Sequence, residues 1–236
     1  MNDNPKPLIQ HLIEFRSVLV NSAFCVLLLT IVCYVFVEEI FGFVSTPLFI
    51  ALKSSGLKEK IIFTSVTEVF TTHLRLAFYS GLFASFPYIM KQIWDFINSG
   101  LKPKESLIAK RIMVISPLLF ILGATFAFYL VIPNVLLALI KSSAASAEFL
   151  PKMNENISFI VIMLISFGIS FQMPIVVFAL DRLLILRAKT LLKLWREIVL
   201  GIVVLSAIIT PPDAFSMVFL AAPLIVVFFI SVFICR

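Results

Sequence analysis

The chain has 236 residues, of which 61% are hydrophobic and only 14% are charged. A soluble domain is usually about half apolar and about a quarter charged, so this composition excludes an ordinary soluble protein. The apolar runs are continuous rather than alternating, which favours transmembrane α-helices over a β-barrel. The net charge of +6 does not indicate nucleic-acid binding, because basic residues gather in the cytoplasmic loops of membrane proteins and no basic run contains interleaved aromatic residues.

Apolar runs of about 20 residues, the length that spans a bilayer, predict an all-α membrane protein with one domain over residues 1–236. Spans are expected at residues 18–37, 74–94, 112–136 and 157–180. The last apolar stretch, 198–235, is interrupted by Thr210-Pro211-Pro212-Asp213. A helix over 198–209 is only about 18 Å long, so the bilayer thins there or the piece is re-entrant. We interpret this stretch as two short helices, which gives six spans; a single kinked helix, which gives five, is the alternative.

The longest segment between predicted spans is 38–73. Its apolar residues have helical spacing over 40–52, which fits an amphipathic helix on the membrane surface that Pro47 should break or bend. Ser65 and Glu68 have the spacing of a capping box and predict the start of the next helix.

Basic residues decide the expected orientation. On one side of the predicted spans lie six of the 19 basic residues, namely Lys53, Lys58, Lys60, Arg75, Lys141 and Lys152. The other 13 lie on the side of the two termini, which is cytoplasmic by the positive-inside rule. Both termini inside require an even number of spans, which favours six.

Among the acidic residues just outside predicted spans on that basic side, Glu14 and Glu105 are the candidate functional ones. Glu14 precedes the first span, and Arg16 is two residues on, so their side chains leave different faces of a helix. Glu105 follows the second span within a basic loop, where Lys102 or Lys104 are possible partners, and Phe96 is an aromatic residue at the membrane boundary. The simpler interpretation is that Glu14 is solvated, that Glu105 pairs with a nearby lysine, and that Phe96 is an ordinary aromatic residue at the membrane interface.

Gln172 lies in the middle of the fourth predicted span. An amide in lipid is costly and usually finds a partner, which is either another helix or the backbone freed by the nearby Pro174.

No metal or cofactor site is expected. His11 and His73 are far apart, the cysteines Cys25, Cys33 and Cys235 lie in apolar runs, and there is no glycine-rich phosphate loop.

Four segments, in order along the chain, resemble motifs of the TatC family, the multi-span core subunit of the twin-arginine protein translocase. Residues 7–16 resemble its opening motif, Pro-Leu-x-x-His-Leu-x-Glu-Leu-Arg, with Phe15 where leucine is usual. Residues 45–48 (Ser-Thr-Pro-Leu) resemble an outer-loop motif, and 92–96 (Gln-Ile-Trp-Asp-Phe) with Glu105 resemble the first inner loop. Residues 210–216 (Thr-Pro-Pro-Asp-Ala-Phe-Ser) resemble the last outer turn.

The resemblance implies a non-enzymatic receptor in a bacterial inner membrane. Its partners would be signal peptides with paired arginines, single-span TatA/TatB-like subunits, further copies of the chain and the lipid bilayer, and the proton-motive force would drive export. Signal-peptide binding is carried over to Glu14, Arg16, Phe96 and Glu105, and structural roles in the outer cap to Pro47, Pro211, Pro212 and Asp213. Gln172 stands where many members have glutamate, and its implied role is contact with a partner helix.

Two other classes are weighed against this one. A small-molecule transporter usually shows paired repeats with broken helices, and the sequence shows no repeat. An intramembrane serine protease needs an embedded serine with a histidine base, whereas both histidines lie outside the predicted spans.

Overall fold

The computed structural model describes residues 8–56, 65–99, 103–143, 152–182, 188–209 and 214–234, and these ranges are helical almost throughout. The helices are α1 (Leu8–Val35), α2 (Val37–Ser54), α3 (Val66–Ser99), α4 (Pro103–Phe126), the π-helix η1 (Ala127–Val131), α5 (Ile132–Ser143), α6 (Met153–Ser170), α7 (Met173–Arg182), α8 (Ala188–Lys193), α9 (Trp195–Ile209) and α10 (Ala214–Ile234).

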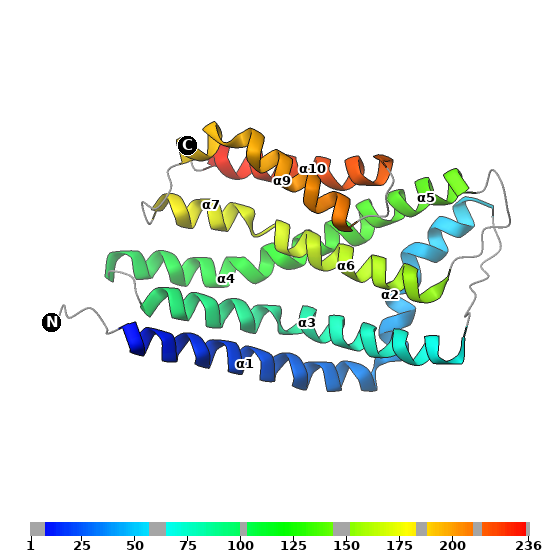
Figure 1. The fold of residues 1–236 in the computed structure, drawn as a ribbon, viewed down its shortest axis with the longest axis horizontal. Coiled ribbons are helices and arrows are strands. Elements are labelled where there is room, and N and C mark those ends of the chain that lie inside the picture. The colour runs from blue at the N-terminus through cyan, green and yellow to red at the C-terminus, as the bar shows by residue number, and fades with distance from the viewer. Residues whose placement is uncertain are drawn as a thin grey trace.

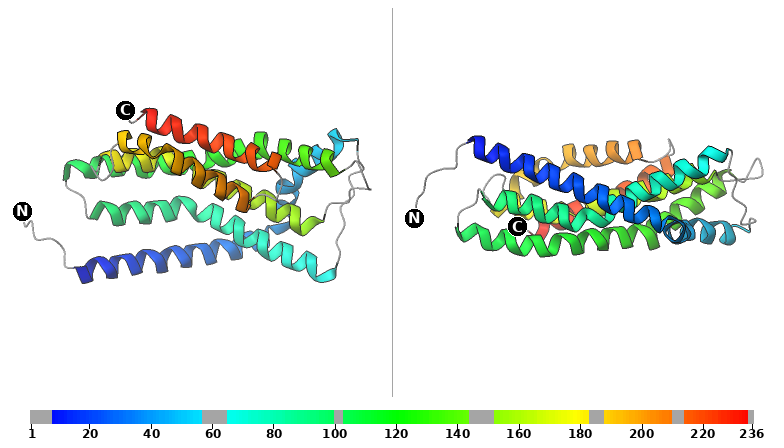
Figure 2. Two further views of the ribbon diagram at one scale, coloured as in Figure 1. Left: turned by 45° about the horizontal axis from the view of Figure 1, so that its top comes forward. Right: turned by 90° about the horizontal axis from the view of Figure 1, so that it is seen from below.

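The long helices run along the long axis of the molecule in alternating directions (Figure 1). Helix α1 packs on α3, α3 on α4, and α4 on α6. Helix α2 lies at the far end and crosses between the others (Figure 1). The start of α1 and the end of α10 lie at the same end of the bundle (Figures 1 and 2). We call this the terminal end, and the end that carries α2 the far end.

Three helical segments of the described chain are long and apolar enough to cross a membrane: Leu12–Val35, Ile112–Lys141 and Met153–Asp181. They coincide with three of the predicted spans. The predicted span 74–94 lies within α3 but is not among them, and it carries Arg75 and Lys91.

Helix α2 differs from the surface helix expected for 40–52. Its apolar face is buried in the protein core rather than lying on a membrane, with Leu48, Ala51 and Leu52 fully buried. Pro47 does not break it, because the helix continues from Val37 to Ser54. The missing N–H costs a helix about 3 kcal/mol, and burial of two leucines, at about 1.5 to 3 kcal/mol each, offsets that cost.

The predicted span 157–180 is interrupted. Helix α6 ends at Ser170, residues 171 and 172 form a turn, and α7 begins at Met173. The backbone carbonyl of Gln172 accepts the N–H groups of both Ile175 and Val176, at 3.0 Å each, which starts the new helix. Pro174 lacks an N–H, so the helical ladder loses one hydrogen bond just after this turn, which favours an interruption here.

Helices α9 and α10 are separate, pack on each other and run in opposite directions (Figures 1 and 2). The alternative of one kinked helix over 198–235 is therefore wrong. Residues Pro211, Pro212 and Asp213, predicted to form the turn, lie outside the described residues.

Candidate functional site

Glu14 lies on the face of α1 that packs against α3. It is half-buried together with Val18 and Ser22, which follow at four-residue intervals on the same face. Leucines of the same helix point outward instead, since Leu12 is 67% exposed and Leu19 is 54% exposed. The packing is thus the inverse of a soluble amphipathic helix, with a carboxylate at the helix–helix boundary and leucines on the outside.

Phe96 of α3 contacts the ring of Phe15, the residue that follows Glu14 on α1. The centroids of the Phe15 and Phe96 rings are 5.6 Å apart, with their planes tilted by 50°. Two residues earlier on α3, Trp94 is buried in an apolar cluster with Ile112 of α4 and Ile175 of α7. This cluster fixes the end of α3 and thereby positions Phe96 beside the start of α1. Arg16 is exposed on α1.

Glu105 lies in the first turn of α4, which begins at Pro103. Its side chain is outside the described residues, so the backbone alone is placed. The end of α3 and the start of α4 both lie at the terminal end of the bundle, as does the start of α1 (Figure 1). The fold therefore brings the segments of Glu14, Phe96 and Glu105 to one end of the molecule.

Gln172 forms a buried two-bond pair with Ser116 of α4, which we call the Ser116–Gln172 clasp. The Ser116 hydroxyl donates to Oε1 of Gln172 at 2.6 Å, and Nε2 of Gln172 donates to the backbone carbonyl of Ser116 at 3.0 Å. Ser116 is 0% exposed and Gln172 is 9% exposed. The amide thus finds its partner on another helix of the same chain, rather than in the backbone near Pro174.

Two glycines let α4 and α6 approach closely beside the clasp. A Cβ on Gly123 would lie 2.7 Å from the carbonyl oxygen of Phe167, and one on Gly168 would lie 2.4 Å from the ring of Phe120. Gly168 precedes Gln172 by four residues, and Gly123 follows Ser116 by seven. These spacings place Gly123 on the same face of α4 as Ser116, and Gly168 one helical turn before Gln172.

The sequence-based interpretation missed Ser116. Its signal was weak, because one serine in an apolar helix usually bonds to its own backbone. Among the described residues, no group of three or more His, Cys, Asp or Glu side chains has an arrangement that could hold a metal ion.

Comparison with known proteins identifies the family. The sequence model of the family "Sec-independent protein translocase protein (TatC)" matches residues 10–223, which is most of the chain. The chain belongs to the TatC family. A TatC protein of Magnetococcus marinus is 36% identical over 231 residues, covering 98% of this chain and 84% of the relative. The TatC protein of Escherichia coli K12 is 31% identical over 234 residues, covering 99% of this chain and 90% of the relative.

The fold agrees with solved TatC structures. The crystal structure of the twin-arginine translocase receptor TatC superposes with a TM-score of 0.85 at 29% sequence identity, covering 94% of this chain and 96% of that one. The structure of the same receptor in the detergent DDM gives 0.86, covering 96% and 99%.

Family membership decides between the classes weighed from the sequence. The chain is a multi-pass membrane protein and a receptor or core subunit of the twin-arginine translocase. It is a transport component rather than an enzyme. The alternatives of a small-molecule transporter and an intramembrane protease are wrong.

Proposed function

We propose that Glu14 and Glu105 bind the two arginines of a twin-arginine signal peptide at the terminal end of the bundle. The observation that carries this proposal is the position of Glu14 on the α1–α3 boundary, with Phe96 held beside the same helical turn. Glu105 lies in the first turn of α4, the helix that follows α3, so its backbone lies at the same end. Two carboxylates on one end of the molecule make a receptor for two guanidinium groups.

The chemistry favours arginine over lysine. A guanidinium presents a planar fork of donors that a carboxylate accepts bidentately, whereas an ammonium is a point charge. Partial burial of Glu14 strengthens such a contact relative to an exposed one. Phe96 supplies an aromatic face on which a guanidinium or an apolar peptide side chain can lie. Arg16 is exposed and leaves a different face of α1 from Glu14, so its part in peptide binding is proposed from the family resemblance alone.

The membrane arrangement is proposed to be six spans with both termini in the cytoplasm of a bacterium. The elements α1, α3, α4 with α5, α6 with α7, α9, and α10 would each cross, which is consistent with the alternating directions in Figure 1. The charge asymmetry of the loops supports the same orientation. In this arrangement the terminal end is the cytoplasmic end, where a precursor made in the cytoplasm arrives, and Pro47, Pro211, Pro212 and Asp213 belong to the outer cap.

Partners within the translocase are proposed from the family. Single-span TatA/TatB-like subunits would assemble with this chain and with further copies of it, and the proton-motive force would drive export. Direct contact of Gln172 with a partner helix stays a prediction. Because its amide bonds to Ser116, we expect it to shape the α4–α7 surface on which a partner packs.

Site-specific crosslinking tests the receptor proposal. A photoreactive residue at position 96 should crosslink to a twin-arginine precursor and much less to the same precursor with Lys-Lys. A photoreactive residue at position 43, which is exposed on α2 at the far end, is the matched control. Equal crosslinking of the two precursors at position 96 would place arginine recognition elsewhere.

A further inference from the structure

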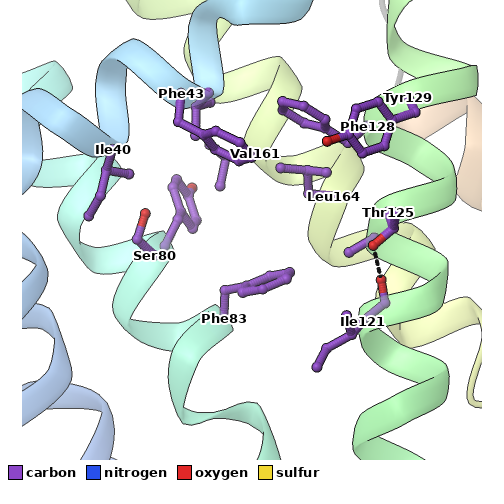
Figure 3. Close-up of a pocket in the computed structure, with 13 residues that line it drawn as sticks. Ile40, Phe43, Ser80, Phe83, Ile121, Thr125, Phe128, Tyr129, Val161 and Leu164 are labelled. Carbon is purple, nitrogen blue, oxygen red and sulfur yellow. Dashed lines mark hydrogen bonds between the residues drawn. The ribbon is translucent and has the colours of Figure 1, made fainter.

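An apolar cavity of about 460 Å³ lies between α2, α3, the α4–η1 segment and α6. Figure 3 shows its aromatic walls. Phe43 of α2 stacks on Phe128 of η1, with ring centroids 4.8 Å apart and planes within 5° of parallel, and Phe83 of α3 lies across the space from them. The hydroxyl of Thr125 in the wall is already bonded to the carbonyl of Ile121 at 2.7 Å, so the walls offer contacts to an apolar occupant.

The cavity is open on one side. Ala124 and Val161 form a buried floor, whereas Phe43 is 60% exposed and Tyr129 is 72% exposed at the mouth. In a multi-pass membrane protein the medium around such a mouth is lipid. The side chains that line an empty apolar cavity lack dispersion contacts on one side. A lipid acyl chain that enters the cavity would supply these contacts.

The volume fits an acyl chain better than a helix. A chain that spans one leaflet is about 15 Å long, half of the hydrocarbon core, and about 4.5 Å across at van der Waals contact, so it fills roughly 250 Å³. A transmembrane helix about 30 Å long and 10 Å in diameter fills roughly 2,400 Å³. The cavity therefore holds one acyl chain with room to spare and cannot enclose a helix.

A cation lies where a lipid headgroup would be. Arg75 precedes the cavity-lining Tyr79 by four residues, so the two share a face of α3. The rise per residue places Arg75 about 6 Å further along the axis, beyond the cavity. Its side chain is exposed, and within the described ranges it forms no ion pair. A phosphate of a lipid whose chain enters the cavity meets this guanidinium.

We propose that the cavity is a binding site for an anionic phospholipid, with one acyl chain between Phe43 and Phe83 and the phosphate on Arg75. The site lies towards the far end of the bundle and does not depend on the signal-peptide proposal. It differs from the general lipid shell because four segments of the chain enclose the acyl chain and one charge selects the headgroup. Such a lipid stays bound when detergent removes the surrounding bulk lipid.

Native mass spectrometry of the chain purified in detergent tests this site. After incubation with equal amounts of phosphatidylglycerol and phosphatidylethanolamine, the protein should retain one phosphatidylglycerol. Thr125→Trp places an indole in the cavity from an exposed position and should reduce retention at least tenfold. Leu122→Trp, which is exposed on the same helix outside the cavity, is the matched control and should retain the lipid.

Arg75→Gln tests the headgroup contact. It should lower the preference for phosphatidylglycerol over phosphatidylethanolamine by about fivefold, the scale of one surface charge near an anionic headgroup, while Arg196→Gln at the terminal end should not. A photoactivatable phosphatidylglycerol should label peptides from α2 and α4 at the cavity. Equal retention by the wild type, Thr125→Trp and Leu122→Trp would overturn the site. So would crosslinking of position 125 to a single-span subunit with no lipid retained.

Discussion

At the scale of single residues, the Ser116–Gln172 clasp shows how this bundle handles polarity in lipid. The hydroxyl of Ser116 donates to the side-chain amide of Gln172, and that amide donates to the backbone carbonyl of Ser116. Both side chains are buried. Hydrogen bonds between membrane helices contribute modestly, about 0.6 kcal/mol on average and about 1.7 at most, because an unfolded chain in lipid also finds partners. The clasp therefore fixes the register of α4 against the α6–α7 turn more than it adds stability.

This predicts coupling between the two positions. Ser116→Ala and Gln172→Leu should each lower the free energy of unfolding in bicelles by about 0.6 to 1.7 kcal/mol. Because Ser116→Ala keeps the backbone carbonyl that accepts from Gln172 and Gln172→Leu removes both bonds, the double variant should cost little more than Gln172→Leu alone. Insertion should be unaffected, since leucine is favourable at mid-membrane. Simply additive costs in the double-mutant cycle would mean that the two side chains do not act as a pair.

At the scale of helices, the α4–α6 contact depends on Gly123. Gly123→Ala should destabilise the protein by about 1 to 3 kcal/mol, the usual cost of overpacking, because the added methyl would meet the backbone oxygen of Phe167 at 2.7 Å. Gly201→Ala on α9 is the matched control, since a Cβ there meets nothing within 4 Å and alanine is the better helix former. Thermal unfolding in detergent would compare them, and equal melting temperatures would contradict the close approach.

Sequence patterns predicted the helices better than their interruptions. The Ser65 hydroxyl accepts the N–H of Glu68 at 3.2 Å and α3 begins at Val66, which confirms the predicted cap. A break at Pro47, one of the two predicted effects of this residue, is wrong because α2 continues through it, and the turn at Gln172 was not predicted. Tertiary contacts contribute to both outcomes. Burial of Leu48 in the core stabilises α2, and Gln172 at the turn pairs with Ser116, which is 56 residues away in the sequence.

At the scale of the whole molecule, the sequence indicated which segments form the candidate site but not how they are arranged. The motifs named Glu14 and Phe96, and the fold adds that Glu14 faces α3 while the leucines of α1 point outward. Hydrophobic spacing alone did not predict that the leucines of α1 point outward. An apolar helix face packs on the protein core in water but can face the surroundings in lipid, and the spacing is the same in both cases.

Cysteine labelling tests the overall orientation. In a background without native cysteines, Lys193→Cys at the end of α8 should react only with a reagent applied from the cytoplasmic side, and a cysteine replacing the C-terminal Arg236 should do the same. Glu39→Cys, exposed on α2 at the far end, should react only from the outside. Positions 39 and 236 labelled from the same side would contradict the six-span arrangement.

The receptor site at the terminal end is the central claim, and the affinity of a twin-arginine signal peptide for the chain in lipid nanodiscs tests it most directly. Glu14→Ala and Glu105→Ala should each weaken binding by about 10- to 100-fold if the charge-assisted contact is shielded from water, and by less if it is exposed. Glu39→Ala at the far end should bind as the wild type does, and a Lys-Lys peptide should bind the wild type more weakly. Wild-type affinity in both Glu14→Ala and Glu105→Ala would contradict the account.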